Sequence, residues 1–352
     1  YLTDFYSVTD EGFVVSEHRT NTLKSVLLNS DYLLVQTNQI KDKLEELTSI
    51  TPKTISLPPS LPHNIFDYLK RPDLSLAKDT IHIGYAGKVQ PRWGVEELLL
   101  WSKELRNSGI KAHLHIATGK IYSSKKGDNF VTRIQGLLQD PDVTLYSGLD
   151  RFGAMSLMRE MDYVWCYRDS LLEASTLEIS TKLIEMAALG KPTICYPSEI
   201  NKDLLGREYP YFIEDKKGFF RILEVKPIDF DFFKLAKKIK IKHSFGEIAN
   251  NFDVALSDKN HKPLNSPKNI LIAGHDLKFI NPWISYLKKK GYQVKVDEWE
   301  WGAAKDENRS KHLLEWADII FCEWGLANAV WYSQNNFSKK PLYIRAHAQE
   351  VR

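Results

Sequence analysis

Two loops carry charged residues beside glycines or a helix start, which is the combination that an anion-binding site requires. The first loop is Gly84-Tyr85-Ala86-Gly87-Lys88-Val89-Gln90-Pro91-Arg92-Trp93-Gly94, between a strand-like run and a helical pattern. Glycine lets the backbone approach an anion closely, Lys88 and Arg92 add positive charge, and the following helix adds its dipole. The same residues also suit a plain strand-to-helix turn, because they match neither the Walker pattern nor G-x-G-x-x-G.

The second loop is the start of the segment Leu177–Pro192. In it Ser180 and Thr181 are typical of a helix start, and Glu178, Lys182 and Glu185 follow one another at steps of four and three residues. We therefore expect these three charged side chains to share one face of a helix. A capped surface helix with Glu–Lys pairs would show the same pattern without any function.

Strands and helices must position these loops, and the sequence alternates between the two. Short β-branched or aromatic runs predict strands at Tyr32–Gln36, Thr54–Leu57, Ile81–Tyr85, Ala112–Ala117, Val143–Tyr146, Tyr163–Tyr167, Pro192–Tyr196, Asn269–Ala273, Gln293–Val296, Asp318–Cys322 and Leu342–Arg345. Helical spacing of apolar residues lies between many of them. This alternation predicts an α/β protein with parallel sheets that helices cover on both faces.

The composition is that of an ordinary globular protein of about two domains. Of 352 residues 43% are hydrophobic, and 48 basic residues against 45 acidic ones leave a formal charge of +3. This balance calls for no nucleic-acid partner, and no apolar run approaches the roughly 20 residues of a membrane span. Three distant cysteines, Cys166, Cys195 and Cys322, predict buried thiols in a cytoplasmic protein, with neither zinc spacing nor disulfides.

Taken together, the motifs resemble the C-terminal domain of GT-B fold glycosyltransferases of the large retaining family 4. That domain carries a glycine turn with a basic residue, an aspartate near a strand, and a Glu-Ala-Met-Ala-x-Gly-x-Pro-Val run. This sequence has Gly87-Lys88, Met161-Asp162 and Glu185-Met186-Ala187-Ala188-Leu189-Gly190-Lys191-Pro192-Thr193-Ile194 in the same order. The resemblance covers about residues 80–256 and implies a GT-B type α/β fold of Rossmann-like, doubly wound parallel sheets.

The flanking segments resemble parts of the N-terminal domain of the same family. Residues 1–66 look like its end, residues 79–256 like the donor domain, residues 257–267 like a linker, and residues 268–352 like a further beginning. The order is typical of a window cut across two tandem units, each with an incomplete N-terminal domain. The two flanking segments either merge into one permuted domain, with strand 269–273 and strand 32–36 in one sheet, or remain separate.

The resemblance also implies roles for individual residues. A nucleotide sugar would bind at Gly87, Lys88, Arg92 and Glu185, with Glu185 on the ribose hydroxyls and the cations on the diphosphate. Glu178 and Lys182 would act near the transferred sugar and its leaving group, and His347 would face the sugar from the N-terminal side. No metal and no separate cofactor are expected. The acceptor would be a glycan or a lipid-linked glycan, which is compatible with peripheral association with a membrane.

At two positions the sequence departs from the family pattern, which weakens the roles assigned to the residues there. Leu177 stands where the family has its upstream glutamate, with Glu178 one residue later, and Trp93 stands where it has a second basic residue. Two alternatives therefore stay open beside a hexosyltransferase. One is a non-catalytic nucleotide-sugar-binding module of a larger synthase, and the other is a nucleotide-sugar epimerase on the same fold.

Overall fold

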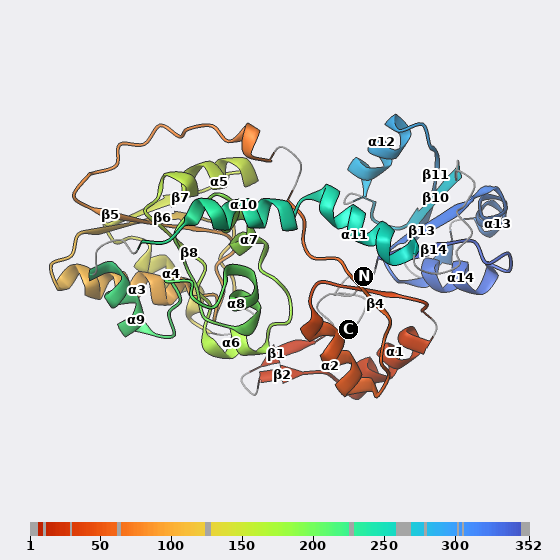
Figure 1. Ribbon diagram of the computed structural model, residues 1–352, viewed down its shortest axis with the longest axis horizontal. Coiled ribbons are helices and arrows are strands. Elements are labelled where there is room, and N and C mark those ends of the chain that lie inside the picture. Colours follow the sequence, from red (N-terminus) through yellow and green to blue (C-terminus); the bar gives the residue numbers. More distant parts are fainter. Residues whose placement is uncertain are drawn as a thin grey trace. The chain divides into compact units, whose positions relative to one another are not determined.

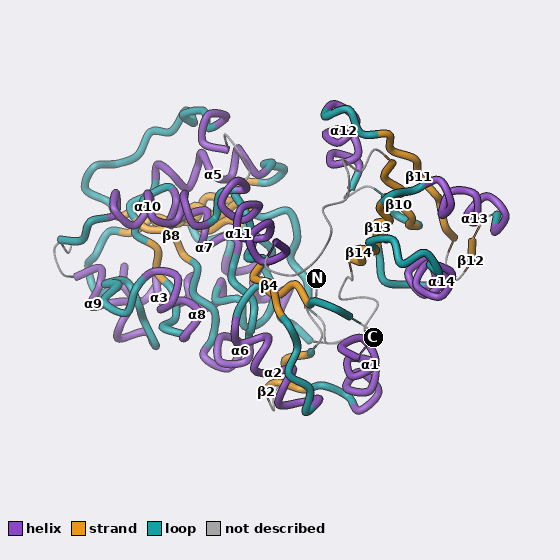
Figure 2. Tube along the Cα trace, turned by 45° about the vertical axis from the view of Figure 1, so that its right-hand side comes forward, coloured by secondary structure: helices purple, strands orange, loops and turns teal. Residues whose placement is uncertain are grey.

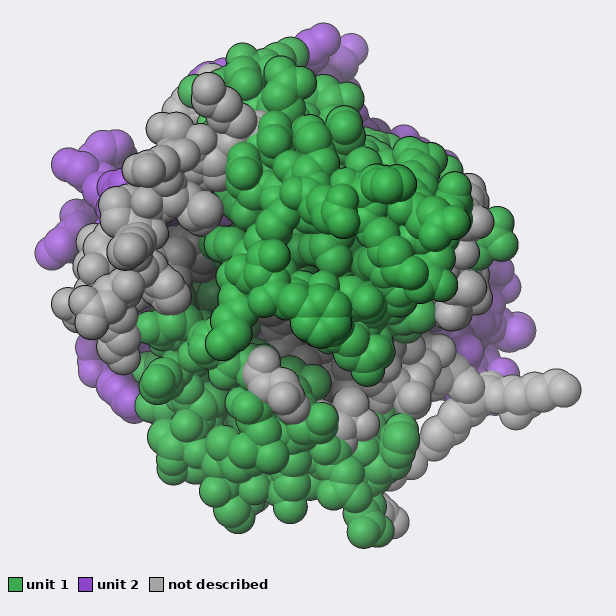
Figure 3. Space-filling model, turned by 90° about the vertical axis from the view of Figure 1, so that its right-hand side faces the viewer, with its two compact units in different colours: residues 1–7, 14–57, 252–352 green, residues 8–13, 58–251 purple. Residues whose placement is uncertain are grey.

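The chain divides into two compact units, which Figure 3 shows in different colours. The computed structural model describes residues 6–9, 12–28, 30–61, 65–123, 128–224, 229–257, 269–277, 280–300, 303–304 and 306–345. Unit 1 comprises residues 1–7, 14–57 and 252–352, and unit 2 comprises residues 8–13 and 58–251. Each unit has its own sheets, so each is described by itself.

Unit 2 is built on a five-stranded parallel sheet in the order β7-β6-β5-β8-β9. The strands are β5 (Ile81–Ala86), β6 (Ala112–Ala117), β7 (Val143–Tyr146), β8 (Tyr163–Trp165) and β9 (Thr193–Ile194). Apolar residues such as Ile83 in β5 and Val164 in β8 are fully buried, as expected for central strands covered on both faces. The order places the first strand of the sheet beside the fourth.

Two helix layers cover this sheet (Figure 1). The helices of unit 2 are α3 (Val95–Asn107), α4 (Phe130–Leu137), α5 (Arg151–Glu160), α6 (Ser170–Ser175), α7 (Thr181–Ala188), α8 (Glu199–Leu205), α9 (Lys216–Glu224) and α10 (Phe232–Lys242), and α11 (Phe245–Ser257) continues into unit 1. A short 3₁₀ helix, η1, spans Ile65–Tyr68. Helix α3 packs on α4 and α9, whereas α7 packs on α5 and α10.

Unit 1 contains a mixed sheet in the order β12-β11-β10-β13-β14, which Figure 2 shows in orange. Its strands are β10 (Asn269–Gly274), β11 (Gln293–Glu300), β12 (Ala303–Ala304), β13 (Ile319–Glu323) and β14 (Leu342–Arg345). Its helices are α12 (Asn281–Lys289), α13 (Glu307–Trp316) and α14 (Ala327–Asn335). Among the strand pairs described in this sheet, β12 pairs with β11 in the antiparallel sense and the others are parallel.

The leading segment forms small separate sheets. Strands β3 (Leu33–Val35) and β4 (Thr54–Ser56) pair in parallel. Helix α2 (Asn38–Thr48) packs beside β3, and helix α1 (Glu17–Leu28) packs on α2. Strands β1 (Ser7–Thr9) and β2 (Gly12–Val14) form a two-stranded sheet that the sequence pattern did not predict.

The predicted parallel α/β architecture is confirmed, but the hypothesis of one merged sheet from the two flanking segments is wrong. Both edges of β10 are occupied, by β11 and β13, and β3 pairs only with β4 among the strands that the structure describes. The linker predicted at residues 257–267 falls almost wholly outside the described residues.

Hydrogen bonds join the start of the large continuous part of unit 2 to the end of α10. Leu61 N–H donates to the carbonyl of His243 over 2.8 Å, and the His243 ring Nδ1 lies 2.8 Å from the carbonyl of Pro59. Since a carbonyl only accepts, Nδ1 carries the proton and His243 is assigned to the Nδ1–H tautomer. Burial lowers the pKa of His243, which is consistent with a neutral ring.

Two loops of unit 2 meet at Gly94, the residue that caps the start of α3. Gly94 has a φ of 76°, and a Cβ added there would lie 2.1 Å from the carbonyl oxygen of Tyr167. Its own carbonyl accepts a 2.8 Å hydrogen bond from the Trp165 indole. The loop after β5 can therefore approach the end of β8 only because residue 94 has no side chain.

We expect Gly94→Ala to destabilise the protein by at least about 3 kcal/mol, since a backbone clash is added to a left-handed backbone. Gly109→Ala is the matched control, because Gly109 also has a positive φ, of 96°, but open space around it. The control isolates the backbone cost, about 1 kcal/mol. Urea unfolding of both variants measures the difference, and equal losses would contradict the close contact.

Candidate anion-binding site

The site lies at the carboxyl ends of β5 and β8, which are neighbours in the sheet of unit 2. The connections that follow these two strands run in opposite directions along the sheet, toward β6 and toward β9. Open parallel sheets bind ligands at such a switch point. The loops that surround it are residues 87–94 after β5 and residues 166–169 after β8.

Arg92 and Asp169 fasten the two loops to each other. The Arg92 guanidinium donates to Asp169 Oδ2 over 2.9 Å, and Asp169 N–H donates to the Arg92 carbonyl over 3.0 Å. The second carboxylate oxygen of Asp169 caps α6 by accepting from Leu172 N–H. Arg92 thus has a structural partner here, and its predicted contact with a bound anion stays a prediction.

Helix α7 positions Lys182 and Glu185 but not Glu178. Its N-cap is Ser180, whose hydroxyl accepts from Leu183 N–H, and the helix begins at Thr181. The prediction that Glu178 shares a helical face with the other two residues is therefore wrong. The capping side chain requires an extended backbone at Ser180, so the chain before it is not helical.

Lys182 reaches back from α7 to the loop after β5. A Cβ added at Gly87, whose φ is 149°, would lie 3.0 Å from Lys182 Nζ and 3.3 Å from the Tyr85 hydroxyl. Nζ also lies 3.9 Å from the centre of the fully buried Tyr85 ring. Two predicted residues, Gly87 and Lys182, are therefore brought together, and the absence of a side chain at residue 87 leaves room for the ammonium group.

Burial lowers the pKa of Lys182 to about 8, and the nearby Arg168 guanidinium contributes in the same direction. No carboxylate among the described residues lies within ion-pair distance of this ammonium group, although Glu185 in the next turn attracts it from farther away. A desolvated cation without a carboxylate counterion is electrostatically prepared to receive an anion.

The other predicted residues occupy distinct surroundings. Glu185 accepts from Arg151 Nε over 2.7 Å, so its carboxylate is already paired with a half-exposed guanidinium. Lys88 is exposed, and its carbonyl accepts from the Tyr85 hydroxyl, which fixes the loop backbone. Glu178 lies in the loop just before α7, and His347 lies outside the described residues.

Sequence reasoning missed Arg168, which follows β8 at the switch point. Its Nε donates to Glu173 Oε1 over 2.6 Å, and Glu173 also accepts from the Asn201 side-chain amide. Glu173 is only 4% exposed, so the Arg168 guanidinium is paired with a buried carboxylate. The position of a charged pair, Arg168-Asp169, directly after a buried strand was the available signal.

The N-terminal end of α3, next to the loop after β5, carries carboxylates that would compete with a bound anion. The first turn of α3 carries Glu96 and Glu97, and burial raises the pKa of Glu97. Carboxylates at a helix N-terminus interact with the same partial charges that would attract a ligand anion. The principal positive charge available to an anion at the switch point is therefore Lys182, with Arg168 and Lys88 as neighbours.

Within the described residues no group of three or more His, Cys, Asp or Glu side chains could hold a metal ion. None of the described helices is long and apolar enough to cross a membrane. All three cysteines are buried free thiols, as predicted.

No protein-family model and no curated protein match this chain, but solved structures do. Sucrose-phosphate synthase from Thermosynechococcus elongatus is 17% identical with a TM-score of 0.52, over 69% of this chain and 62% of that one. S. aureus TarM, in a complex with fondaparinux, alpha-GlcNAc-glycerol and UDP, is 13% identical with a TM-score of 0.52, over 72% and 49%. The GtfA/B complex is 10% identical with a TM-score of 0.51, over 72% and 51%.

These structures include GT-B-type glycosyltransferases, and this likeness together with the parallel sheets confirms the predicted GT-B type, Rossmann-like α/β fold. The chain spans between about half and three fifths of the length of these proteins.

Lys182→Met is expected to stabilise the protein at neutral pH, because it removes a desolvated charge. The pKa of Lys182 is lower in the folded state, about 8, than its ordinary value of 10.5, so the unfolded state binds more protons between these values. The free energy of unfolding of the unsubstituted protein therefore rises with pH from about 8 to 10.5, by up to roughly 3 kcal/mol. Urea unfolding across this range should show a gain for Lys182→Met that shrinks as pH rises.

Lys88→Met serves as the control, since Lys88 is exposed on the same loop. We expect little change in stability for it at any pH in this range. A Lys182→Met variant that is less stable than the unsubstituted protein at neutral pH would show that the ammonium group is well compensated.

Proposed function

We propose that this protein is a glycosyltransferase that binds a nucleotide-sugar donor at the switch point of unit 2. The observation that carries the proposal is the Lys182 ammonium group, which lies against Gly87 with no described carboxylate as ion-pair partner. A donor diphosphate would supply the missing negative charge. The GT-B type fold and the UDP that the similar TarM structure contains support the same assignment.

Lys182 and Arg168 would act on the diphosphate, on which negative charge grows as the glycosidic bond breaks. Such charge is stabilised most by cations that are already desolvated and fixed before the reaction. Arg168 is fixed by the buried Glu173, and Lys182 by its packing on Tyr85. Lys88 and Arg92 remain further candidates, Arg92 only if it exchanges Asp169 for the ligand.

Retention of configuration and independence of a metal ion belong to the proposal through the family resemblance. Glu178 is assigned a contact near the sugar, and His347 an approach from an N-terminal domain. A glycan or lipid-linked acceptor follows from the same resemblance.

The decisive experiment is calorimetric titration with UDP-, GDP- and ADP-sugars, followed by a transfer assay with the full-length protein. Binding of one nucleotide sugar that Lys182→Met weakens about tenfold or more, with transfer to an acceptor, is the expected result. Binding without transfer would favour the non-catalytic module, and interconversion of the donor sugar would favour the epimerase. Absence of binding for the whole panel would refute the donor site.

Donor affinity should fall as pH rises through about 8, since only the protonated Lys182 attracts a diphosphate. The bound anion raises the pKa of Lys182 again, so binding above pH 8 takes up a proton. Titration in buffers of different ionisation enthalpy measures that uptake. Lys182→Met should bind the donor about tenfold or more weakly, and without the pH dependence. An unchanged pH profile in this variant would assign the effect to another group.

Glu185→Ala is expected to weaken donor binding by about 1–3 kcal/mol if its carboxylate accepts the ribose hydroxyls. Arg151→Gln is the matched comparison, because it removes the partner of Glu185 but keeps the carboxylate. A direct ribose contact predicts a much smaller loss for Arg151→Gln, and equal losses would mean that the ion pair, not the ribose contact, matters.

A further inference from the structure

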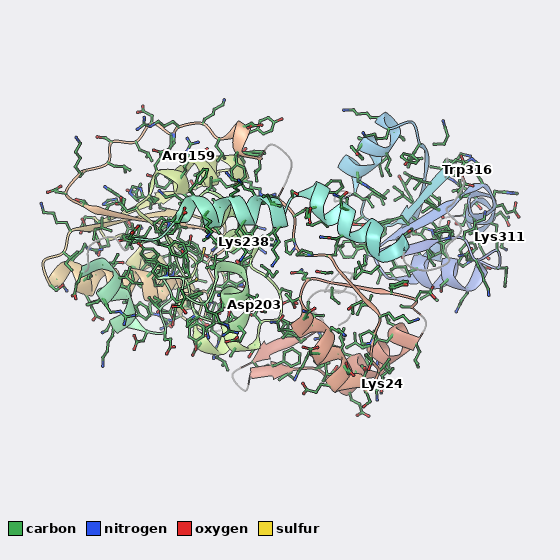
Figure 4. The ribbon with its side chains drawn as sticks, in the orientation of Figure 1. Lys24, Arg159, Asp203, Lys238, Lys311 and Trp316 are labelled. Carbon is green, nitrogen blue, oxygen red and sulfur yellow. The ribbon has the colours of Figure 1, made fainter. Side chains whose placement is uncertain are left out.

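Helix α10 presents an exposed basic surface that the proposed donor site does not use. The lysine face of α10 consists of Lys234, Lys237, Lys238, Lys240 and Lys242, all of which are exposed (Figure 4 labels Lys238). Three large apolar side chains accompany it: Phe233 is 81% exposed, Ile241 55%, and Phe245, the first residue of α11, 57%. We propose that this face binds the surface of an anionic lipid bilayer.

The inner side of α10 explains why these residues point outward. Leu235, Ala236 and Ile239 are buried, and the helix packs on α7 through this stripe. Phe233, Lys237 and Ile241 follow one another at steps of four residues, so they lie along the opposite side of the helix. The buried stripe of α10 therefore forms its contact with the core of unit 2, and the exposed side chains of Phe233 and Ile241 lie outside that contact.

The charges on this face are not neutralised by the protein. None of the five lysines forms an ion pair with a carboxylate in the described part of the chain, and α10 itself contains no acidic residue. Other surface lysines are paired: Lys111 with Asp79, Lys202 with Glu199, and Lys216 with Glu104. Asp231, which precedes the helix, caps it through Lys234 N–H. The unbalanced positive charge calls for an anionic partner.

The mixture of lysines with exposed apolar side chains favours a bilayer over nucleic acid. Lipid phosphates attract lysines near the surface, and the acyl boundary beneath them accepts phenylalanine and isoleucine. Nucleic acid would use the lysines, but its phosphates offer nothing to aliphatic side chains such as Ile241. Lys240 also packs over the ring of Phe66, 4.3 Å from its centre, so its stem is already ordered.

Sedimentation of the full chain with vesicles tests the proposal, without any nucleotide present. Binding to phosphatidylglycerol-containing vesicles, absence of binding to phosphatidylcholine alone, and loss of binding at high salt are expected. The triple variant Lys234→Gln/Lys237→Gln/Lys238→Gln should partition about a hundredfold more weakly, since each lysine contributes about fivefold. The control variant Lys202→Gln/Lys216→Gln removes two paired lysines elsewhere on unit 2 and should change partitioning little.

Apolar insertion is tested separately at Phe233. Because Cys166, Cys195 and Cys322 are buried, Phe233→Cys gives one accessible thiol for a polarity-sensitive fluorophore. Its emission should shift to shorter wavelength with anionic vesicles. Phe337→Cys is the matched control, because Phe337 is 85% exposed and belongs to unit 1, and its label should not shift.

Three results would overturn the proposal: no binding to anionic vesicles at low salt, unchanged binding of the triple lysine variant, or no emission shift at residue 233. Tight binding of single-stranded RNA that depends on the same lysines, with no shift on vesicles, would assign the face to nucleic acid instead. Nucleotide-sugar affinity is measured on the same variants and should be unchanged, so failure of this proposal and failure of the donor site are distinguishable.

Discussion

The close contact between the Gly94 backbone and the Tyr167 carbonyl sets the geometry of unit 2 at its functional edge. It brings the loops after β5 and β8 together, and the Trp165 indole and the Arg92–Asp169 pair then hold them there. A side chain at residue 94 would force the loops after β5 and β8 apart.

The energetics of the candidate site rest on the desolvation of Lys182, whose side chain is half-buried. Lys182 is kept in a place where its charged form is costly, while the neighbouring charges Glu185, Arg151, Arg92 and Asp169 are paired within the protein. The folded protein thus holds one cation at a raised electrostatic energy that an arriving anion can relieve. Under the function proposed above, this cost in stability would be exchanged for affinity toward the anion.

Much of the fold followed from the sequence because buried parallel strands are nearly continuous apolar runs. The run Ala112–Ala117 matches the mostly buried β6 residue for residue, and Val143–Tyr146 matches β7, an edge strand that is only partly buried. The two-stranded sheet of β1 and β2 was not predicted, because Ser7–Thr9 and Gly12–Val14 are short and contain no run of buried apolar residues.

The candidate site was predicted only in part. Spacing along the chain placed Lys182 and Glu185 on α7, but it could not show that the Ser180 cap ends the helix before Glu178. The pairing of Arg92 with Asp169 and of Arg168 with Glu173 depends on which strands are neighbours, and local sequence does not encode the order of strands in a sheet.

The hydrogen bonds among Pro59, Leu61 and His243 join the start of the long continuous segment of unit 2 to the end of α10, not far before that segment ends. A segment whose two ends lie close together can be removed or inserted as one piece. Its removal or transplantation leaves a gap that a few residues can close, at little cost in loop entropy. The same adjacency would let new chain termini be opened elsewhere on its surface, so this segment is a suitable target for circular permutation.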